Sequence, residues 1–473
     1  MTVSKSISGD GGDQIKSGEA SAMTADSDAF MPREYPSTIS AWTAVIVLFL
    51  LYILSLADRY VIAMMVDPIK DGLGVSDFHI SLLQGPVFAI LYCLFAIPVG
   101  LALDRFSRRL VLFLCVIIWS LGATGCGLAG TFAMLAIARS LVGAGEAGFS
   151  TGAYSIIGDS FPPRKVSLAM SVFVMGGVMG AGIVFLLGGP LIDMILHGAV
   201  SDWPILSAFA PWQQAFIVTG LPGIAMAFLV FLFKDPPRSQ KPKTENDGAL
   251  GYGDALSFIK KHYQIYTAIF LGFGVVYTVT ISLQLWLPSY LGRVHGWVPK
   301  DIGIYMGVAQ ILGALTLPLH GSIVGYIYRR GFKDAHLLWC ILCILLAGPV
   351  IVAALMVPNP YIGVILFGFY MGFILSTASM GPASTQVVTP QHLRGRVSAI
   401  YVLTTGLIGM SVGPSIVGWI TTNVFADEMR VGHSLIIVAI GGLALTVALF
   451  SWGRAQMRAL MSEAEAVEAA DAQ

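Results

Sequence analysis

Twelve apolar stretches, each long enough to cross a lipid bilayer, constrain this chain more than any other feature of its sequence. A helix of about 20 apolar residues spans the hydrocarbon core. The composition agrees, since 56% of the 473 residues are hydrophobic and only 11% are charged. We therefore predict an all-α membrane protein with twelve transmembrane helices, near 41–66, 80–103, 109–129, 131–155, 166–190, 212–233, 264–290, 302–327, 335–356, 360–386, 397–422 and 433–453.

The distribution of basic residues predicts how the chain is oriented. Of the 27 lysines and arginines, 21 lie in the tails and in alternate loops, and four lie in the remaining loops. Loops rich in lysine and arginine stay in the cytoplasm. Both termini are therefore expected to be cytoplasmic, as an even number of spans requires. The 27 basic residues are balanced by 27 acidic residues, so no overall field favours nucleic acid as a partner.

The longest loop divides the chain into two halves. This loop, KDPPRSQKPKTENDG from Lys234, has the proline and charge content of a flexible linker. GLALDRFSRR at Gly100 is echoed by GSIVGYIYRR at Gly321, which indicates an internal repeat, and transporters build a central site between such repeats. The predicted regions are a disordered cytoplasmic N-terminal tail (1–40), an N-terminal six-helix bundle (41–233), a cytoplasmic linker with an interfacial helix (234–262), a C-terminal six-helix bundle (263–453) and a cytoplasmic C-terminal tail (454–473).

The N-terminal tail and the surface helix after the linker, both outside the spans, are predicted from their amino-acid composition. Residues 1–40 are rich in serine, glycine, aspartate and alanine and lack the pattern of a signal peptide, so a disordered tail is expected. The stretch YGDALSFIKKHY after the linker predicts a short helix at the membrane surface, with Leu256, Phe258 and Ile259 facing lipid.

Four ionised residues stand well inside the predicted spans: Asp58 and Arg59 on the first, and Arg139 and Glu146 on the fourth. Each costs at least about 2.5–3.5 kcal/mol at a helix centre, so such residues usually face a partner or a cavity. Arg139 and Glu146 are seven residues apart and share one helix face. Asp58 and Arg139 lie at a similar depth, so we expect these two side chains to pair and Arg59 to face the cavity.

A single proton changes the electrical balance of this cluster. Two acids and two arginines sum to zero, and protonation of one acid leaves the cluster positive. Desolvation favours the neutral form of a carboxyl group, whereas a nearby guanidinium favours the charged form. A guanidinium that is freed in this way binds two oxygens of a phosphate or carboxylate. Proton and anion binding are then linked. The alternative is a pair of buried salt bridges that only fix helix packing.

The C-terminal half contributes no comparable charge to its spans. One wall of a central cavity would be ionic and the other apolar, which favours an amphiphilic substrate over a sugar. His320 is interpreted as a packing residue. Cys340 and Cys343 have a metal-like or redox-like spacing without a second pair, and we interpret them as packing too. No metal, cofactor or catalytic residue is expected. The polar residues on the C-terminal helices are Tyr277, Gln284, His320, Tyr370, Thr377 and Thr385.

Two motifs resemble signatures of the major facilitator superfamily. GLALDRFSRR resembles the loop between helices 2 and 3, and RSLVGAGEA resembles the helix 4 signature. The resemblance covers essentially the whole membrane region and implies two pseudo-symmetric six-helix bundles that alternate access. It also implies a cytoplasmic gate in which Asp104 meets the positive N-terminal end of a helix from the other half. The residues assigned to this gate are Gly100, Asp104, Arg105 and Arg108.

Within that superfamily, ADRYVIAMMVDPIKDGLGVSD and GAGEAGFSTGAYSIIGDSFPPRKVSLAMSVF resemble the Spinster group, whose members are implicated in moving sphingoid and lysolipids. The resemblance implies a proton-coupled lipid transporter. The residues assigned to proton coupling are Asp58 and Glu146, and those assigned to substrate binding are Arg59, Arg139, Tyr60 and Tyr370. Short loops and the lack of glycosylation acceptors imply a bacterial inner membrane. We expect a monomer whose partners are an amphiphilic small molecule, protons and the bilayer.

Three other functions remain open. The first is a proton-coupled carrier of organic anions or drugs. The second is an intramembrane hydrolase that uses Ser150 with a histidine, although the first six helices have only His79 and His197, near helix ends. The third is a non-transporting sensor on the same scaffold, which would not need both carboxylates.

Overall fold

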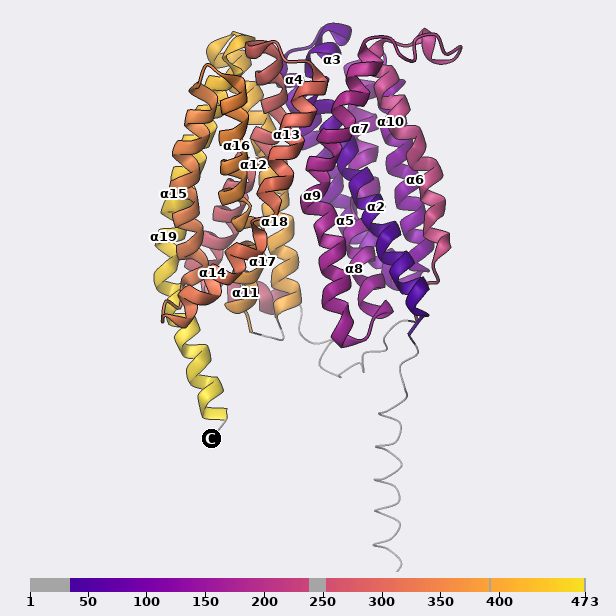
Figure 1. Cartoon of the computed structure of the whole chain (residues 1–473). Helices are drawn as coiled ribbons and strands as arrows, with labels where there is room; N and C mark the ends of the chain where they lie inside the picture. Colours follow the sequence, from indigo (N-terminus) through magenta and orange to yellow (C-terminus); the bar gives the residue numbers. More distant parts are fainter. Residues whose placement is uncertain (1–34, 238–251, 391–392, 472–473) are drawn as a thin grey trace, which may run out of the picture.

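The computed structural model describes residues 35–237, 252–390 and 393–471, and these ranges form a bundle of α-helices without a strand (Figure 1). Helices are the expected form because lipid offers backbone groups no hydrogen-bond partners. Within the described ranges, twelve helices are long and apolar enough to cross a membrane. This confirms the predicted all-α class and the number of spans. Residues 1–34 of the predicted N-terminal tail and residues 238–251 of the predicted linker lie outside the described residues.

The spanning helices form two groups of six in chain order. The first group is α2 (Thr38–Ala63), α4 (Asp77–Gln84) with α5 (Pro86–Arg105), α6 (Arg108–Gly127), α7 (Phe132–Glu146) with α8 (Phe149–Ser160), α9 (Pro163–Leu196), and α10 (Pro211–Ala227) with η3 (Phe228–Leu232). The second group is α12 (Tyr263–His295), α13 (Pro299–Ala314) with α14 (Leu317–Arg329), α15 (Ala335–Met356), α16 (Pro360–Ile374) with α17 (Ser376–Val387), α18 (Arg394–Trp419) with η4 (Ile420–Phe425), and α19 (Val431–Asp471). Shorter elements are α3 (Val66–Leu73), η2 (Leu206–Ala208), α11 (Tyr252–Lys261) and η5 (Glu428–Arg430).

The second and fourth spans of each half are interrupted, three of them near their middles and the first closer to one end. The breaks lie at Gly85, at 147–148, at 315–316 and at Leu375. Equivalent breaks in both halves agree with the internal repeat that the sequence indicates. Interrupted helices in the middle of a transporter mark the region where substrate and coupling ions bind.

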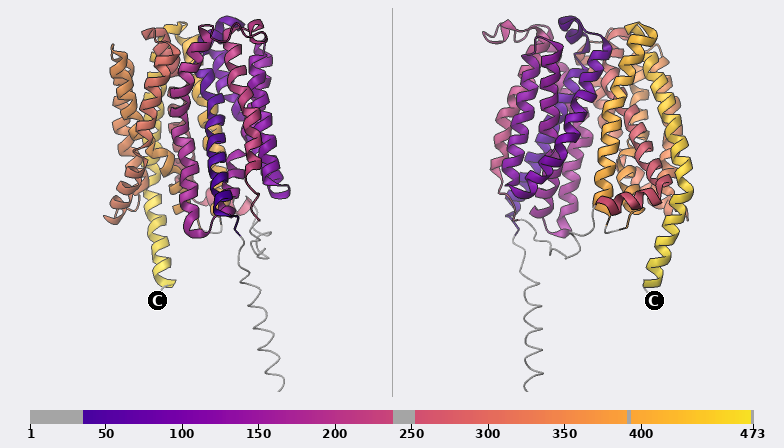
Figure 2. Two further views of the ribbon diagram at one scale, coloured as in Figure 1. Left: turned by 45° about the vertical axis from the view of Figure 1, so that its right-hand side comes forward. Right: turned by 180° about the vertical axis from the view of Figure 1, so that it is seen from behind.

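The two halves meet along two helix pairs, α9 with α13, and α4 and α5 with α18. Glycines make the close approach possible. A Cβ on Gly189 of α9 would stand 2.6 Å from the Cα of Gly303 on α13, and a Cβ on Gly418 of α18 would stand 2.7 Å from the carbonyl of Asp77 on α4. Figure 2 shows that α2 begins and α19 finishes at the same end of the bundle. We call that end the terminal end and the opposite one the far end.

The surface helix α11 differs from its predicted orientation. Leu256 is 55% exposed, as expected, but Phe258 and Ile259 are only half-buried and pack against the core of the C-terminal half. Phe258 contacts Tyr266 of α12, with ring centroids 6.0 Å apart. The prediction that all three apolar residues face lipid was therefore wrong for two of them, because α11 folds beneath the bundle and buries part of its apolar face.

Candidate functional site

A cavity of about 470 Å³ lies between the two halves, at the level of the interrupted helices. Helices of both halves contribute to its wall. In the part of the chain that the structure describes, Arg59 and Glu146 are the two charged residues among those that line it. Its other polar lining residues are Tyr52, Ser55, Tyr60, Tyr92, Ser150, Tyr277, Thr280, Gln284, Gln310, Thr377, Tyr401 and Thr405.

Arg59 and Glu146 form an ion pair in the N-terminal wall of this cavity. The guanidinium of Arg59 donates from Nε to Oε2 of Glu146 at 3.0 Å, and Nη2 donates to the same oxygen. Its Cζ atom lies 4.6 Å from the centre of the Phe88 ring and 5.7 Å from that of Tyr92. The side chain of Arg59 is 20% exposed and that of Glu146 is 2% exposed. The arginine therefore reaches the cavity, and the carboxylate holds it there.

Small residues in the stretch GAGE position Glu146. Gly143 packs directly on the backbone carbonyl of Phe88, and a Cβ on Gly145 would stand 2.5 Å from the backbone nitrogen of Trp119. Helix α7 therefore lies tightly against α5 and α6. It ends at Glu146, where the span is interrupted before α8 begins at Phe149. The carboxylate thus projects from a rigid helix end into the centre of the bundle.

Asp58 and Arg139 lie behind the wall of the cavity, and their contact differs from the predicted one. Nη1 of Arg139 donates to the backbone carbonyl of Asp58 at 2.9 Å. Within the described part of the chain, the Asp58 carboxylate has no ion pair or hydrogen bond with Arg139. Both residues are buried, with exposed fractions of 3% and 1%. The predicted side-chain pair was wrong because Arg139 reaches past the carboxylate to the main chain of α2.

Phe88 connects these two parts of the charge cluster. The Cζ atoms of Arg59 and Arg139 lie 4.6 Å and 5.5 Å from the centre of its ring. The aromatic face attracts both guanidinium groups. The four charges thus gather in one region, as expected from the sequence, but only two of them reach the cavity.

The two tyrosines assigned to substrate binding have different positions. Tyr60 lines the cavity and donates a hydrogen bond of 2.7 Å to Oε1 of Gln284, which joins α2 to α12 of the other half. Tyr370 is fully buried beside Phe367, with ring centroids 6.1 Å apart, and is not among the lining residues. In this conformation Tyr60 can therefore contact a ligand in the cavity directly, whereas Tyr370 lies behind the cavity wall and cannot.

A second cavity of about 470 Å³ adjoins the first between α9 and the junction of α13 with α14. Val174 and Val178 of α9 line both cavities. Its other lining residues are mainly methionine, leucine, alanine and proline. Met175 and Leu315, on opposite sides of this cavity, are 45% and 62% exposed on the apolar surface of the bundle. The central cavity therefore has an apolar side chamber that borders the membrane face.

The four residues assigned to the cytoplasmic gate lie at the terminal end of α5 and α6. Arg108 is buried and forms ion pairs with Asp159 of its own half at 2.6 Å and with Asp235, at the start of the linker, at 3.1 Å. A Cβ on Gly100 would meet open space. Asp104 and Arg105 are exposed. The contacts of Arg108 therefore hold the terminal end of the N-terminal half together rather than joining it to the other half.

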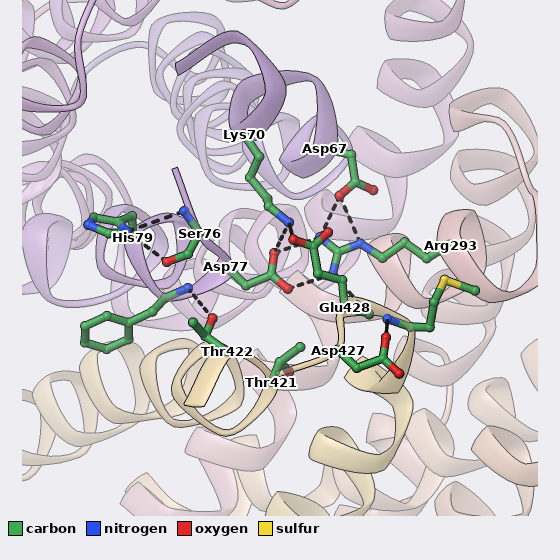
Figure 3. A network of polar contacts seen from close by, with 12 residues as sticks. Asp67, Lys70, Ser76, Asp77, His79, Arg293, Thr421, Thr422, Asp427 and Glu428 are labelled. Carbon is green, nitrogen blue, oxygen red and sulfur yellow. Dashed lines mark hydrogen bonds and ion pairs between the residues drawn. The ribbon is translucent and has the colours of Figure 1, made fainter. Parts of the chain in front are cut away.

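An ionic network closes the far end between the halves (Figure 3). Arg293 of α12 donates from Nη1 and Nη2 to the two carboxylate oxygens of Asp77 at 2.7 and 2.8 Å, and from Nη2 to Asp67 at 2.6 Å. Lys70 pairs with Asp77 at 2.8 Å and with Glu428 of the C-terminal half at 2.5 Å. We call these five residues the far-end lock. All of the hydrogen bonds that Arg293 donates to Asp67 and Asp77 join the C-terminal half to the N-terminal half.

His320 behaves as a packing residue. One of its ring nitrogens, Nε2, lies 2.6 Å from the carbonyl of Gly372, and Nδ1 accepts a hydrogen bond from Trp339 at 3.1 Å. Both nitrogens are thus engaged.

Ser150 lines the central cavity, but no histidine is among the lining residues that the structure describes.

Several residues of interest were missed by the sequence analysis. Gln310 and Tyr92 line the cavity but sit in ordinary apolar helical sequence, where one polar residue gives little signal. In the sequence, the charged residues of the far-end lock look like ordinary charges of loops between spans. Its signal was the scarcity of basic residues on that side, where Lys70 and Arg293 are two of only four.

Comparison with known proteins agrees with this arrangement. A family model described as Major Facilitator Superfamily matches residues 48–414. Protein spinster homolog 1 of Xenopus tropicalis is 27% identical over 445 residues, which cover 86% of this chain and 80% of that protein. The hexuronate transporter of Bacillus subtilis (strain 168) is 26% identical over 405 residues, which cover 84% of this chain and 92% of that protein.

A solved structure is also similar. It is a bacterial homologue of the human lysosomal transporter Spinster, in an inward-facing and unoccupied conformation. It superposes with a TM-score of 0.71 at 25% sequence identity, covering 90% of this chain and 98% of that one. The predicted resemblance to the Spinster group is confirmed.

Proposed function

This chain belongs to the Major Facilitator Superfamily, and we propose that it is a proton-coupled secondary active transporter of an amphiphilic lipid, of sphingolipid or lysolipid type, working by alternating access. Its family and its Spinster-like relatives point to a membrane transporter rather than an enzyme. One observation carries the lipid proposal. Among the described residues, the central cavity has one ion pair on one wall, and it adjoins an apolar chamber at the membrane face.

The shape of the two joined cavities suits a molecule with a charged head and an apolar tail. Arg59 offers a planar guanidinium whose fork matches two oxygens of a phosphate or carboxylate. The chamber beside Val174 and Val178 offers apolar side chains and borders the bilayer. A lipid with its head at Arg59 would keep its tail in apolar surroundings throughout its passage.

Glu146 is the group through which we propose that a proton acts. In this conformation Oε2 of Glu146 accepts both hydrogen bonds from Arg59, and Oε1 has no partner among the residues that the structure describes. Protonation of the carboxylate would remove its attraction for Arg59 and release the guanidinium for a headgroup. Asp58 lies within the same charge cluster, and we assign it the second coupling role.

The terminal end of the bundle is proposed to be cytoplasmic, in a bacterial inner membrane. Loops at that end carry most of the lysines and arginines. The far-end lock then faces outward, and the conformation described here is closed to the outside. Gly100, Asp104, Arg105 and Arg108 would close the cytoplasmic side in the opposite state.

A carrier of organic anions is the second candidate, because a hexuronate transporter is among the relatives. Arg59 would bind a carboxylate equally well. The apolar chamber favours the lipid, since a small hydrophilic anion has no use for it. A non-transporting sensor would have no need of a carboxylate that masks the guanidinium within the cavity.

Reconstitution into liposomes tests the proposal. Purified protein is offered a panel of lysolipids, sphingoid bases, hexuronates and lipophilic drugs, with and without an imposed proton gradient. We expect gradient-dependent movement of at least one single-chain lipid and none of hexuronate. Movement of hexuronate alone would favour the second candidate, and movement of nothing in the panel would contradict both.

Replacement of Arg59 by alanine tests the headgroup contact. Binding of an anionic or zwitterionic lysolipid should weaken by about tenfold or more, because charge-assisted hydrogen bonds are lost. Binding of a neutral monoacylglycerol should change little. Dissociation constants of the two lipids in detergent give the comparison. Equal losses for both would exclude Arg59 as the headgroup contact.

A further inference from the structure

Gln310 of α13 is a buried amide that faces the central cavity without a partner. Its side chain is 2% exposed, and it is among the lining residues. Its Oε1 atom has no hydrogen-bond partner, and no hydrogen bond from Nε2 occurs among the described residues. About nine in ten buried polar groups have a partner. A ligand in the cavity would supply the missing one.

The backbone that carries Gln310 is firmly held. Helix α13 packs on α9, and a Cβ on Gly182 of α9 would stand 2.9 Å from the carbonyl of Gly307 and 3.2 Å from the backbone nitrogen of Ile311. Gln310 lies between these two contact points in the sequence. The amide is thus presented to the cavity from a rigid helix rather than from a mobile loop.

Several other uncharged polar groups of the cavity already have hydrogen-bond partners within the protein. Thr280, Thr377 and Thr405 donate to carbonyls of their own helical turns at 2.9, 2.7 and 2.7 Å. Tyr60 donates to Gln284 at 2.7 Å. Gln310 differs from these four residues, because its amide can both donate and accept and its Oε1 atom has no partner among the described residues.

We propose that Gln310 binds a hydroxyl or amide group that the transported amphiphile carries next to its charged group, and that this contact determines specificity. The inference rests on the proposed function. Arg59 takes the charged group from the N-terminal half, and Gln310 takes its uncharged neighbour from the C-terminal half, so that one molecule contacts both halves. A site that hydrogen-bonds a substrate hydroxyl rejects an analogue that lacks it, because the buried polar group is left unpaired.

A pair of matched lipids tests this proposal. One probe is an oleoyl glycerol phosphate with a free 2-hydroxyl, and the other is its 2-deoxy analogue. Both are offered to the full-length protein in liposomes. We expect the unmodified protein to prefer the hydroxyl lipid by about fivefold to tenfold in competition. Gln310→Leu should move both lipids equally well. Gln310→Met serves the same purpose if the leucine variant does not fold.

Gln84 provides the control. It is also buried, at 5% exposure, and both of its amide atoms lack partners in the described part of the chain, but it does not line the cavity. Gln84→Leu should keep the full preference for the hydroxyl lipid. The inference is overturned if the unmodified protein does not distinguish the two lipids, if Gln310→Leu still does, or if Gln84→Leu loses the preference equally. If the unmodified protein moves neither probe but moves a hexuronate or a drug of the panel, the lipid proposal itself fails. If it moves only a sphingoid base, the same comparison is made with that base and its analogue without the hydroxyl, and equal movement of the two overturns the inference.

Discussion

Replacement of Glu146 by glutamine is expected to abolish proton-driven transport while the protein stays folded. Glutamine has nearly the same shape as glutamate but does not ionise, so Arg59 would lack a charged partner at every pH. The cavity would then carry a permanent positive charge, and no proton would accompany the substrate. Uptake into liposomes under an imposed proton gradient should fall to background. Exchange of labelled for unlabelled substrate without a gradient should continue, because it needs no net proton movement.

Asp193 offers a matched control for this experiment. It is a carboxylate in the spanning helix α9, its side chain is only 17% exposed, and it does not line the cavity. Asp193→Asn should therefore leave proton-driven uptake intact. Full proton-driven uptake by the Glu146→Gln variant would remove Glu146 from the coupling mechanism.

Asp58→Asn is expected to remove coupling as well, but with a different effect on affinity. Glu146 holds Arg59 directly, so its replacement should strengthen the binding of an anionic headgroup. Asp58 neither lines the cavity nor pairs with Arg59, so its replacement should leave that affinity unchanged. Binding and uptake measured on the same variants separate the two roles. Full coupling in Asp58→Asn would leave Glu146 as the one coupling carboxylate of the pair.

The sequence predicted the spans and the region of the charge cluster because both depend on simple energetics. Apolar length determines which segments enter lipid, and a charge inside such a segment requires a partner or a cavity. The sequence did not predict which charges pair. Asp58 and Arg59 are adjacent and differ by about 100 degrees around the helix. A small rotation of α2 decides which of them meets α7, and that rotation is set by packing across several helices.

The far-end lock escaped prediction for another reason. Lys70, Asp77 and Arg293 lie at helix ends, where charges are common and usually contact water. Only the folded chain brings α3, α4 and α12 together and buries these side chains, to 6%, 1% and 6% exposure. Contacts between halves that are more than 200 residues apart in sequence leave no local pattern.

Replacement of Arg293 by alanine is expected to open the far end of the bundle. Arg293 donates hydrogen bonds to Asp77 and Asp67, which belong to the other half. Loss of one partner from a buried ion pair costs at least about 3 kcal/mol. The Asp67 contact contributes less, because that side chain is 42% exposed. A change of about 3 kcal/mol alters the ratio of two conformations by about a hundredfold, which is enough to reverse a moderate preference.

Distances between spin labels at the far end measure this shift. Labels at Asp71 and Asn423, both exposed and in different halves, should move apart in the Arg293→Ala variant, and substrate uptake should fall because the closed state is depopulated. Arg430→Ala is the control, since Arg430 is 54% exposed and pairs at 3.5 Å with Asp427 in its own half. It should leave the label distance unchanged. An unchanged distance in Arg293→Ala itself would mean that the Lys70–Glu428 ion pair and the glycine contacts between α9 and α13 hold the far end closed without Arg293.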